Sequence, residues 1–322
     1  NLIAITIGDI NGIGIKILID LFNKKKIDNF ILFSNLNIIK TYIKKNKLKL
    51  KLNIINKKTK KLNFQKDNFN LFSFESKSLE ENTYKSLKYA YEFCDKNICI
   101  GMITLPLRKD LIKKNVNKNF IGHTEYFQKI NKKKYVNMIL FHKKVIISPI
   151  TTHIEIKKIS KLISNKKYIY NQIYNLNKTL KVDFNFTKPR LIISGLNPHA
   201  GENGEIGKEE KETIIPVINK LKNKGIDIKG PVSADSILLN NNLKKFDCFI
   251  FIFHDQALIP FKLISQFSGV NYTGNLDIIR TSPDHGTAYD MVNTNNYSNQ
   301  SFMNCYKLIN QIYKNRRINV KS

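Results

Sequence analysis

The sequence lacks three features that would place it in a membrane or extracellular class. Its apolar stretches, such as "CFIFIF" at 248–253, are far shorter than the roughly 20 residues of a membrane-spanning helix. Its first residues, "NLIAITIGDI", have no basic region of the kind that opens a signal peptide. The four cysteines are scattered and form no CxxC pair, which indicates buried thiols. We therefore expect a cytoplasmic protein with no membrane partner.

Acidic residues are also scarce, since 25 Asp and Glu face 54 Lys and Arg and the net charge is +29. Such a charge attracts phosphate backbones. The lysines, however, are spread among asparagine and isoleucine, and no nucleic-acid motif accompanies them. We interpret the charge as a composition bias at solvated positions and expect no specific nucleic-acid partner. The alternative is a catalytically idle basic protein that binds nucleic acid.

Short apolar segments alternate with longer amphipathic ones, which predicts an α/β protein with a largely parallel sheet. The first strand is expected at 2–8, followed by the glycine-rich turn "GDINGIG" and a helix with Ile13, Ile17 and Leu21 on one face. Further strands are expected at 30–33, 98–104, 136–141, 145–150, 190–194 and 248–253, and helices around 81–95, 155–180, 208–224 and 300–315. At 322 residues the chain is long enough for two domains.

Three histidines each follow an expected strand: His153 in "TTHIE", His199 in "GLNPHAGENGEIG" and His254 in "HDQ". The carboxyl ends of strands build the binding crevices of open α/β sheets, so these side chains can converge. Three imidazoles with an open position suit Zn²⁺ or a similar ion, which can polarise a hydroxyl or carbonyl oxygen. The alternative is that each histidine caps its loop, because their wide spacing lacks the usual HxxxH signature.

A second group of polar residues has the chemistry of an anion site. Lys262, Asn271 and Arg280 offer a point charge, a neutral donor and a planar fork. "GHTE" at 122–125 adds His123 and Thr124 where a helix N-terminus would favour the same anion. The alternative is solvated charge together with helix capping by Thr124.

The order and wording of the motifs carry a resemblance to a known family. They are "ITIGDINGIG", "GHTEYF", "TTHIEI", "GLNPHAGENGEIGKEE", "GPVSAD", "FHDQALIPFK" and "GVN" followed by "IRTSPDHGTAYD". From about residue 2 to residue 292 the chain closely resembles the 4-hydroxythreonine-4-phosphate dehydrogenase family of vitamin B6 biosynthesis.

The resemblance implies an NAD- or NADP-dependent oxidation of 4-phosphooxy-L-threonine to 2-amino-3-oxo-4-phosphooxybutanoate, which decarboxylates to 3-amino-2-oxopropyl phosphate. It implies a homodimer with a divalent metal (Zn²⁺, Mg²⁺ or Co²⁺) in a site shared across the interface. It also implies two α/β/α domains of the isocitrate and isopropylmalate dehydrogenase type, with the active-site cleft between them. A dehydrogenase of the same family that acts on another phosphorylated hydroxy acid is the alternative.

The family's domains and site residues transfer to this chain motif by motif. The nucleotide-binding domain is expected at 1–120 plus 266–322, and the substrate, metal and dimerisation domain at 121–265. The metal ligands are His153, His199 and His254, and the substrate contacts are His123, Thr124, Lys262, Asn271 and Arg280. The catalytic residues are Asp235, Asp255 and Lys109, although both aspartates could instead orient the histidines. The cofactor contacts are Gly8, Asp9, Gly12, Gly14, Asp284, His285, Gly286 and Thr287.

The sequence departs from the family at a few positions. The family usually shows "GDPAGIGPE" in its first turn, where this chain has Ile10, Asn11, Ile15 and Lys16 in place of Pro, Ala, Pro and Glu. Leu105 replaces a small residue, and Glu205 stands where a histidine sometimes occurs. Because GxGxxG is also absent, the alternative for "GDINGIG" is a tight strand-to-helix turn without a ligand.

Overall fold

The computed structural model describes residues 1–56, 63–294 and 296–321. The chain forms two compact units, each discontinuous in sequence. Unit 1 contains Asn1–Ile130 and Asp277–Tyr313, and unit 2 contains Asn131–Leu276 and Lys314–Ser322. Both units combine parallel strands with helices, so the predicted α/β class is confirmed.

The strands of unit 1 are all parallel and lie in the order β3, β4, β2, β1, β5, β12. Their bounds are β1 (Ile3–Thr6), β2 (Phe30–Ser34), β3 (Leu52–Ile55), β4 (Phe69–Ser73), β5 (Gly101–Thr104) and β12 (Arg280–Pro283). Every residue of β1, β2 and β5 is buried. This is expected for parallel strands with helices on both faces, and it explains why these strands are continuous apolar runs in the sequence.

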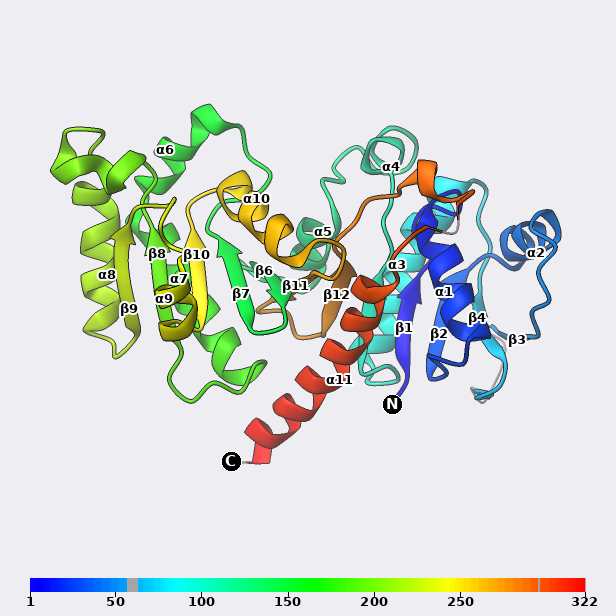
Figure 1. The fold of residues 1–322 in the computed structure, drawn as a ribbon. Helices are drawn as coiled ribbons and strands as arrows, with labels where there is room; N and C mark the ends of the chain where they lie inside the picture. Colours follow the sequence, from blue (N-terminus) through cyan, green and yellow to red (C-terminus); the bar gives the residue numbers. More distant parts are fainter. Residues whose placement is uncertain (57–62, 295, 322) are drawn as a thin grey trace. The chain divides into compact units, whose positions relative to one another are not determined.

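The helices of unit 1 cover both faces of its strands. Helix α3 packs on β1, β2 and β5, and Figure 1 shows α1 and α11 in front of these strands and α3 behind them. Their bounds are α1 (Ile13–Asn23), α2 (Leu36–Lys45), α3 (Leu79–Asp95), α4 (Lys109–Asn115), α5 (His123–Ile130), the 3₁₀ turn η4 (Tyr289–Met291) and α11 (Gln300–Lys321). The last residues of α11 belong to unit 2.

The strands of unit 2 lie in the order β11, β6, β7, β10, β8, β9. Strand β6 is antiparallel to both β11 and β7, and the other pairs are parallel. Their bounds are β6 (Asn137–His142), β7 (Val145–Pro149), β8 (Arg190–Ser194), β9 (Asp227–Val232), β10 (Cys248–Phe251) and β11 (Val270–Gly274). The carboxyl ends of β7, β10 and β8 therefore lie at one edge of this sheet, directly before the three histidine segments.

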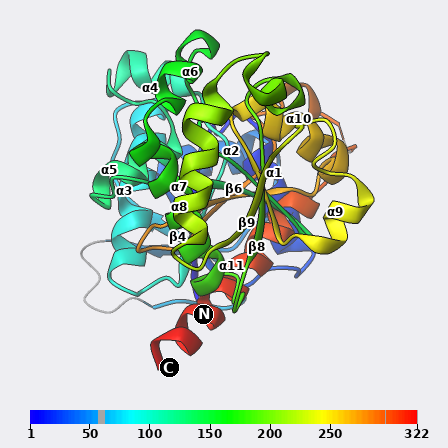
Figure 2. The same cartoon turned by 90° about the vertical axis from the view of Figure 1, so that its left-hand side faces the viewer.

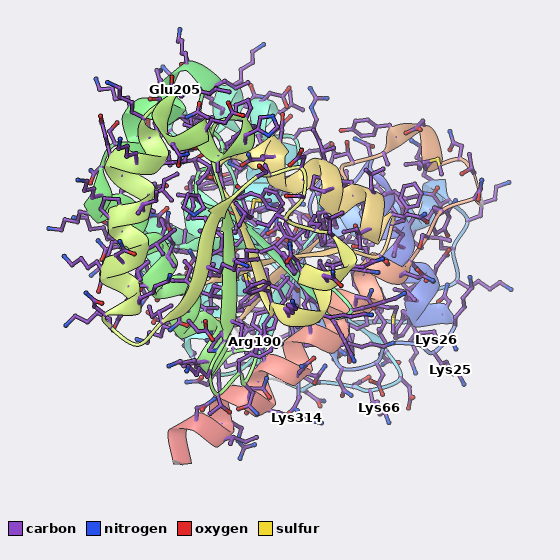
Figure 3. The ribbon with its side chains drawn as sticks, turned by 60° about the vertical axis from the view of Figure 1, so that its left-hand side comes forward. Lys25, Lys26, Lys66, Arg190, Glu205 and Lys314 are labelled. Atoms are coloured by element: carbon purple, nitrogen blue, oxygen red, sulfur yellow. The ribbon has the colours of Figure 1, made fainter. Side chains whose placement is uncertain are left out.

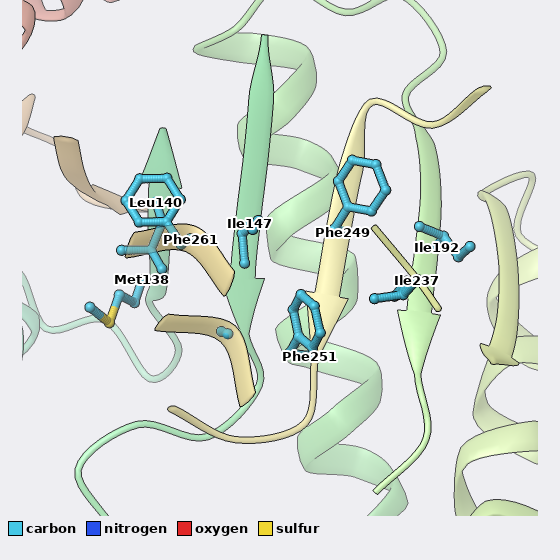
Figure 4. Packing of buried hydrophobic residues seen from close by; sticks show 9 residues of the cluster. Met138, Leu140, Ile147, Ile192, Ile237, Phe249, Phe251 and Phe261 are labelled. Atoms are coloured by element: carbon cyan, nitrogen blue, oxygen red, sulfur yellow. The ribbon is translucent and has the colours of Figure 1, made fainter. Parts of the chain in front are cut away.

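Two layers of helix enclose the unit 2 strands, with α7 and α8 on one side and α9 and α10 on the other (Figure 2). Phe249, Phe251 and Phe261 belong to the buried cluster between the strands and α10 (Figure 4). The helical bounds are η1 (Ile156–Lys158), α6 (Ile159–Ile163), α7 (Lys166–Val182), η2 (Pro198–Gly204), η3 (Glu210–Ile214), α8 (Ile215–Lys222), α9 (Asn240–Lys245) and α10 (His254–Ser265).

The units differ from the predicted domain bounds of 1–120 plus 266–322 and 121–265. Unit 1 extends to Ile130, because Tyr126 of α5 packs its ring against Tyr84 of α3 at 5.5 Å. Unit 2 extends to Leu276, because β11 pairs with β6. The end of α11 joins unit 2 through Arg316, whose Nε donates to Asp183 Oδ1 at 2.7 Å.

The single helix predicted at 155–180 is wrong, because the structure divides it into η1, α6 and α7. Asn165 separates α6 from α7, and its side chain accepts a hydrogen bond from the Tyr168 backbone N–H at the N-terminus of α7. Asparagine is a favoured N-cap residue, so it begins a new helix inside an otherwise amphipathic run.

Lysine side chains project from many elements, and Lys25, Lys26, Lys66 and Lys314 are labelled in Figure 3. All four are exposed. Among the described residues, no helix is both long enough and apolar enough to cross a membrane.

Candidate active site

In unit 2, hydrogen bonds beyond the ends of two parallel strands bring His153 and His254 together. Past β7 and β10, the Thr151 backbone N–H and the Thr151 hydroxyl both donate to the Ile252 carbonyl, at 3.0 and 2.9 Å. His153 and His254 each follow two residues later. Their ring centroids are 5.6 Å apart, with 44° between the ring planes. The predicted convergence at the strand ends is therefore confirmed for this pair.

The carboxyl group of Asp255 orients the His254 ring. Asp255 Oδ1 lies 2.6 Å from His254 Nδ1. A proton on Nδ1 donated to this carboxylate leaves the lone pair of Nε2 available to a ligand, which is the usual support for a metal-binding imidazole.

Gln256 connects the turn before His254 with the end of β8. Its Oε1 accepts hydrogen bonds from the Ile252 N–H at 2.9 Å and from the Ser194 hydroxyl at 3.2 Å. Its Nε2 donates to the Gly195 carbonyl at 3.1 Å. One amide side chain therefore fixes the start of both the His254 helix and the His199 loop.

The loop that carries His199 has an unusual backbone. Six consecutive residues have positive φ angles, and four of them are not glycine: His199 (49°), Ala200 (53°), Gly201 (81°), Glu202 (41°), Asn203 (58°) and Gly204 (103°). A left-handed conformation costs a residue with a β-carbon roughly 1–2 kcal/mol. The surrounding structure must therefore impose this shape on the loop.

Glu210, at the start of η3, supplies much of that support. Its carboxyl group is buried and accepts hydrogen bonds from the backbone N–H groups of Leu196 and Asn197 at 2.7 and 2.8 Å. It also accepts one from Asn197 Nδ2 at 3.0 Å. A β-carbon at Gly201 would lie 2.7 Å from Glu210 Oε2, so the loop closes tightly over this carboxyl group.

The donor set fits a divalent ion only in part. His153 and His254, with ring centroids 5.6 Å apart, supply two imidazoles of the kind that a divalent ion such as Zn²⁺ takes as ligands. His199 is exposed. Within the described part of the chain, no three His, Cys, Asp or Glu residues form a group that could hold a metal. One chain therefore brings together two of the three expected ligands and not the third.

The other residues predicted for unit 2 lie in different surroundings. Asp235 is exposed in the turns between β9 and α9, and its side chain has no hydrogen bond or ion pair with the described residues. Lys262 lies on the exposed side of α10 near its end. Asn271 is on β11, where its side-chain oxygen is buried without a hydrogen-bond partner among the described residues.

In unit 1, Arg280, one of the predicted anion contacts, has a buried guanidinium. It is 2% exposed, and its Nε and Nη2 donate to the Thr104 hydroxyl at 3.0 and 2.6 Å. Burial lowers the pKa of Arg280 to about 10, and the group remains cationic at neutral pH. Arg280 is the first residue of β12, and its side chain reaches Thr104 at the carboxyl end of β5, where a fixed cation is suited to bind an anionic group.

His123, the first residue of α5, lies in the field of this cation. Its Nε2 is shielded from solvent and has no hydrogen-bond partner among the described residues. Burial, then the charges of Arg280 and Lys109, hold its pKa well below the usual value. A β-carbon at Gly122 would lie 3.2 Å from Lys109 Nζ, so this glycine lets the ammonium approach the backbone. Thr124 follows His123 in the first turn of α5.

The two segments predicted to contact the cofactor meet in unit 1, as expected. The Ile13 N–H donates to the Thr287 carbonyl at 2.8 Å. Asp9 accepts a hydrogen bond from the Asn11 N–H at 2.9 Å through its side chain, and one from the Gly12 N–H at 3.0 Å through its carbonyl. The backbone donors of residues 11–13 are therefore already bonded within the protein and do not form an open phosphate cradle.

Close packing accounts for the three glycines of this turn. Gly8 has φ +61°, and a β-carbon there would lie 2.5 Å from the Pro106 carbonyl oxygen. A β-carbon on Gly12 would lie 2.9 Å from the Thr287 carbonyl oxygen, and one on Gly14 3.3 Å from the Leu105 side chain. Close backbone contacts therefore require glycine at Gly8 and Gly12.

Other residues of these segments also form hydrogen bonds within the protein. The Tyr289 hydroxyl donates to Asp9 Oδ2, and the Asp284 N–H donates to the Ser301 hydroxyl at 2.8 Å. His285 Nδ1 lies 2.9 Å from the Gly286 carbonyl oxygen.

Sequence reasoning missed several supporting residues, of which Thr104, Glu210 and Gln256 are the clearest. Glu210 and Gln256 stand inside the quoted motifs "GEIGKEE" and "FHDQ". A polar residue inside a site motif was the signal that the sequence offered. The groups that Glu210 and Gln256 bond lie elsewhere in the sequence, so their roles could not be read from the motif.

Known proteins are similar to this chain in both sequence and fold. The family described as "Pyridoxal phosphate biosynthetic protein PdxA" matches residues 26–309. A 4-hydroxythreonine-4-phosphate dehydrogenase from Sulfurihydrogenibium sp. is 34% identical and covers 91% of this chain and 92% of its own. A D-threonate 4-phosphate dehydrogenase from Salmonella typhimurium is 32% identical over 71% of this chain and 69% of its own.

A solved structure supports the same assignment. The crystal structure of 4-hydroxythreonine-4-phosphate dehydrogenase from Klebsiella pneumoniae has a TM-score of 0.83 at 26% identity and covers 97% of this chain and 98% of its own. The match therefore extends over both units. This chain belongs to the family of the pyridoxal phosphate biosynthetic protein PdxA.

Proposed function

We propose that the chain oxidises 4-phosphooxy-L-threonine at its C3 hydroxyl, with NAD or NADP as the hydride acceptor. The product, 2-amino-3-oxo-4-phosphooxybutanoate, is a β-keto acid that loses CO₂ to give 3-amino-2-oxopropyl phosphate. Family membership, with a 34% identical dehydrogenase relative that covers 91% of the chain, carries the proposal.

The buried cluster in unit 1 supports binding of the substrate phosphate. Arg280 supplies a fixed charge and directional donors, and Lys109 supplies a second cation that acts on His123. A phosphate beside the unpartnered Nε2 of His123 would favour a proton on that ring, because opposite charge raises the pKa of a base. Thr124, Lys262 and Asn271 complete the proposed substrate contacts.

His153 and His254 are proposed to hold a divalent ion, with His199 as the third ligand. When bound, such an ion lowers the free-energy cost of removing the proton of a hydroxyl group. Asp255 keeps Nε2 of His254 available through its contact with Nδ1. Asp255 is therefore proposed as a positioning residue, while Asp235 and Lys109 remain the candidates for proton transfer.

Helix α10 supports the proposed homodimer. Ala257 and Phe261 face the core, whereas Ile259, Leu263 and Phe267 expose 64, 76 and 73% of their surface. Ile259 and Leu263, one turn apart on α10, form an exposed apolar row, and Phe267 is exposed two residues past the end of the helix. A second copy covering this row would bring its own residues close to the incomplete histidine pair. We expect a dimer in sedimentation velocity, and a monomer at micromolar concentration would contradict the shared site.

The Salmonella relative favours a second candidate, oxidation of D-threonate 4-phosphate. The two substrates share the phosphate and the hydroxyl group, so the Arg280 cluster serves both. They differ at C2, where one carries an amino group and the other a hydroxyl group.

The deciding experiment measures NADH and NADPH formation by the purified chain with each substrate, after chelation and with Zn²⁺, Mg²⁺ or Co²⁺ restored. We expect turnover with 4-phosphooxy-L-threonine, a loss of at least about 100-fold in His254→Ala (removal of a metal ligand), and wild-type rates in the surface variant Lys178→Ala. Turnover confined to D-threonate 4-phosphate would replace the leading candidate with the second. No turnover of either substrate by the folded, metal-loaded chain would refute both.

A further inference from the structure

Unit 1 contains a cavity of about 480 Å³ beside the "GDINGIG" turn. This volume lies in the range of about 300–1,000 Å³ that is typical of small-ligand sites. Its lining comes from four places: the turn itself, helix α2 with its C-cap, Leu79 at the start of α3, and residues 292–293 after η4. The cavity therefore lies next to both segments for which cofactor contacts were predicted, although the turn has no open phosphate cradle.

The lining combines apolar walls with neutral polar groups. Ile10, Ile38, Leu79 and Val292 supply apolar surface, and Tyr42 adds an aromatic ring. Leu79 is 43% exposed, so part of this apolar surface faces solvent. Asparagine and threonine side chains complete the lining. A flat heteroaromatic base with a ribose attached matches this mixture of walls and hydrogen-bonding groups.

Lys16 fixes one wall of the cavity. Its Nζ donates to the carbonyl oxygens of Val292 and Thr294 at 2.8 and 2.7 Å and lies 4.9 Å from the centre of the Tyr297 ring. Ile10 and Asn11 of the turn line the same cavity.

The lining of the cavity carries positive charge and no negative charge among the described residues. Lys45, in the last turn of α2, is its single charged side chain among the described residues, and no carboxylate contributes. In nucleotide-binding folds a carboxylate near the ribose bonds the 2′-hydroxyl of NAD, whereas a basic residue accommodates the 2′-phosphate of NADP. An ammonium group binds phosphate as a point charge.

We propose that this cavity binds the adenosine end of the cofactor and that Lys45 contacts the 2′-phosphate, so that the chain prefers NADP to NAD. The inference rests on the proposed function, because it takes the ligand to be a nicotinamide dinucleotide. Lys45 is a specificity residue in this assignment, and Lys16 positions the wall formed by residues 292–294.

The test compares binding of adenosine 2′,5′-bisphosphate with binding of adenosine 5′-monophosphate by isothermal titration calorimetry on the full chain. We expect the bisphosphate to bind at least about tenfold more tightly, the range for one charge-assisted phosphate contact. Lys45→Ala should remove this difference, whereas Lys40→Ala, an exposed lysine of the same helix outside the lining, should keep it. Equal affinities in the wild type, or a preference that survives in Lys45→Ala, would overturn the assignment of Lys45.

A second variant tests the location of the site. Asn37 is exposed and lines the cavity, so Asn37→Trp should fill it, weaken both nucleotides at least about tenfold and leave the thermal unfolding temperature unchanged. Undiminished binding in this variant would place the adenosine end elsewhere. Neither nucleotide measurement needs substrate or turnover. Failure here with dehydrogenase activity intact would refute the cavity and leave the proposed function standing.

Discussion

The two units differ in which groups of their candidate sites are buried. Unit 1 buries the functional groups themselves: Arg280 is 2% exposed and Nε2 of His123 is shielded from solvent. Unit 2 leaves His153 and His199 exposed and buries a group that supports the His199 loop, the carboxyl group of Glu210. A buried functional group is tuned by its surroundings, whereas an exposed one depends on a supporting group that holds its backbone in place.

The two glycine-rich segments show the same contrast. The turn at Gly8–Gly14 has glycines because other parts of the chain approach it closely. The backbone N–H groups of residues 11–13 donate hydrogen bonds within the protein. The loop at residues 199–203 has mostly non-glycine residues in left-handed conformations, which Glu210 stabilises. Similar compositions therefore serve packing in one unit and an imposed loop shape in the other.

The largest loss of stability is expected from removing the Glu210 carboxyl group of unit 2. Glu210→Ala leaves the N–H groups of Leu196 and Asn197 without their acceptor, and a buried donor without a partner costs about 1–3 kcal/mol. We expect the free energy of unfolding to fall by about 2–5 kcal/mol in urea denaturation. Glu212→Ala is the matched control, since this exposed glutamate lies in the same helical segment. An equal loss in both variants would remove the special role of Glu210.

An intermediate effect is expected from crowding the turn in unit 1. In Gly12→Ala the new methyl group meets the Thr287 carbonyl at 2.9 Å, and overpacking of this kind costs about 1–3 kcal/mol. Gly286→Ala, in the segment that packs on this turn, places its methyl group in open space and should change stability by less than about 0.5 kcal/mol. Thermal and urea unfolding of both variants measures the difference. A Gly12 variant as stable as the wild type would show that the contact relaxes freely.

The smallest effect is expected on the pH dependence of stability, to which buried His123 of unit 1 contributes. In the unfolded state His123 gains a proton below about pH 6.5, the ordinary pKa of histidine. In the folded state burial lowers this pKa, so the side chain stays neutral. Acid therefore favours the unfolded state, by at most about 1.4 kcal/mol per pH unit. His123→Gln should lose less stability than the wild type between pH 7 and pH 5, whereas Lys129→Gln, on the same helix, should lose as much. Parallel curves for His123→Gln and the wild type would contradict a neutral buried imidazole.

The parts of the fold that the sequence predicts are those governed by local pattern. Strands β1, β2 and β10 are buried apolar runs, and α1 and α3 follow the expected helical spacing. Strands β3, β4, β9, β11 and β12 were not predicted, and the residues of β9, "DIKGPV", and β12, "RTSP", are not typical of strands. Their strand conformation comes from pairing with β8 and β5, which no local pattern records.

For the candidate site too, some features could be predicted from the sequence and others could not. Motif position was enough to predict that His153 and His254 converge and that the "GDINGIG" and "DHGTAYD" segments meet. It was not enough to show that residues 11–13 would bond within the protein, since the Thr287 carbonyl comes from a segment more than 270 residues away. Nor could it show the cavity near Lys45, whose lining comes from separate parts of unit 1.

The hydrogen bonds of Gln256 have a consequence for how this site can evolve or be redesigned. Because one amide contacts Ser194, Gly195 and Ile252, the helix that begins at His254 and the loop that carries His199 share a mechanical anchor. A substitution that moves one segment is transmitted to the other through that side chain. A library that aims at a new metal or a new substrate should therefore vary residues 194–195, 252 and 256 together, because changes made singly will be opposed by the partners left unchanged.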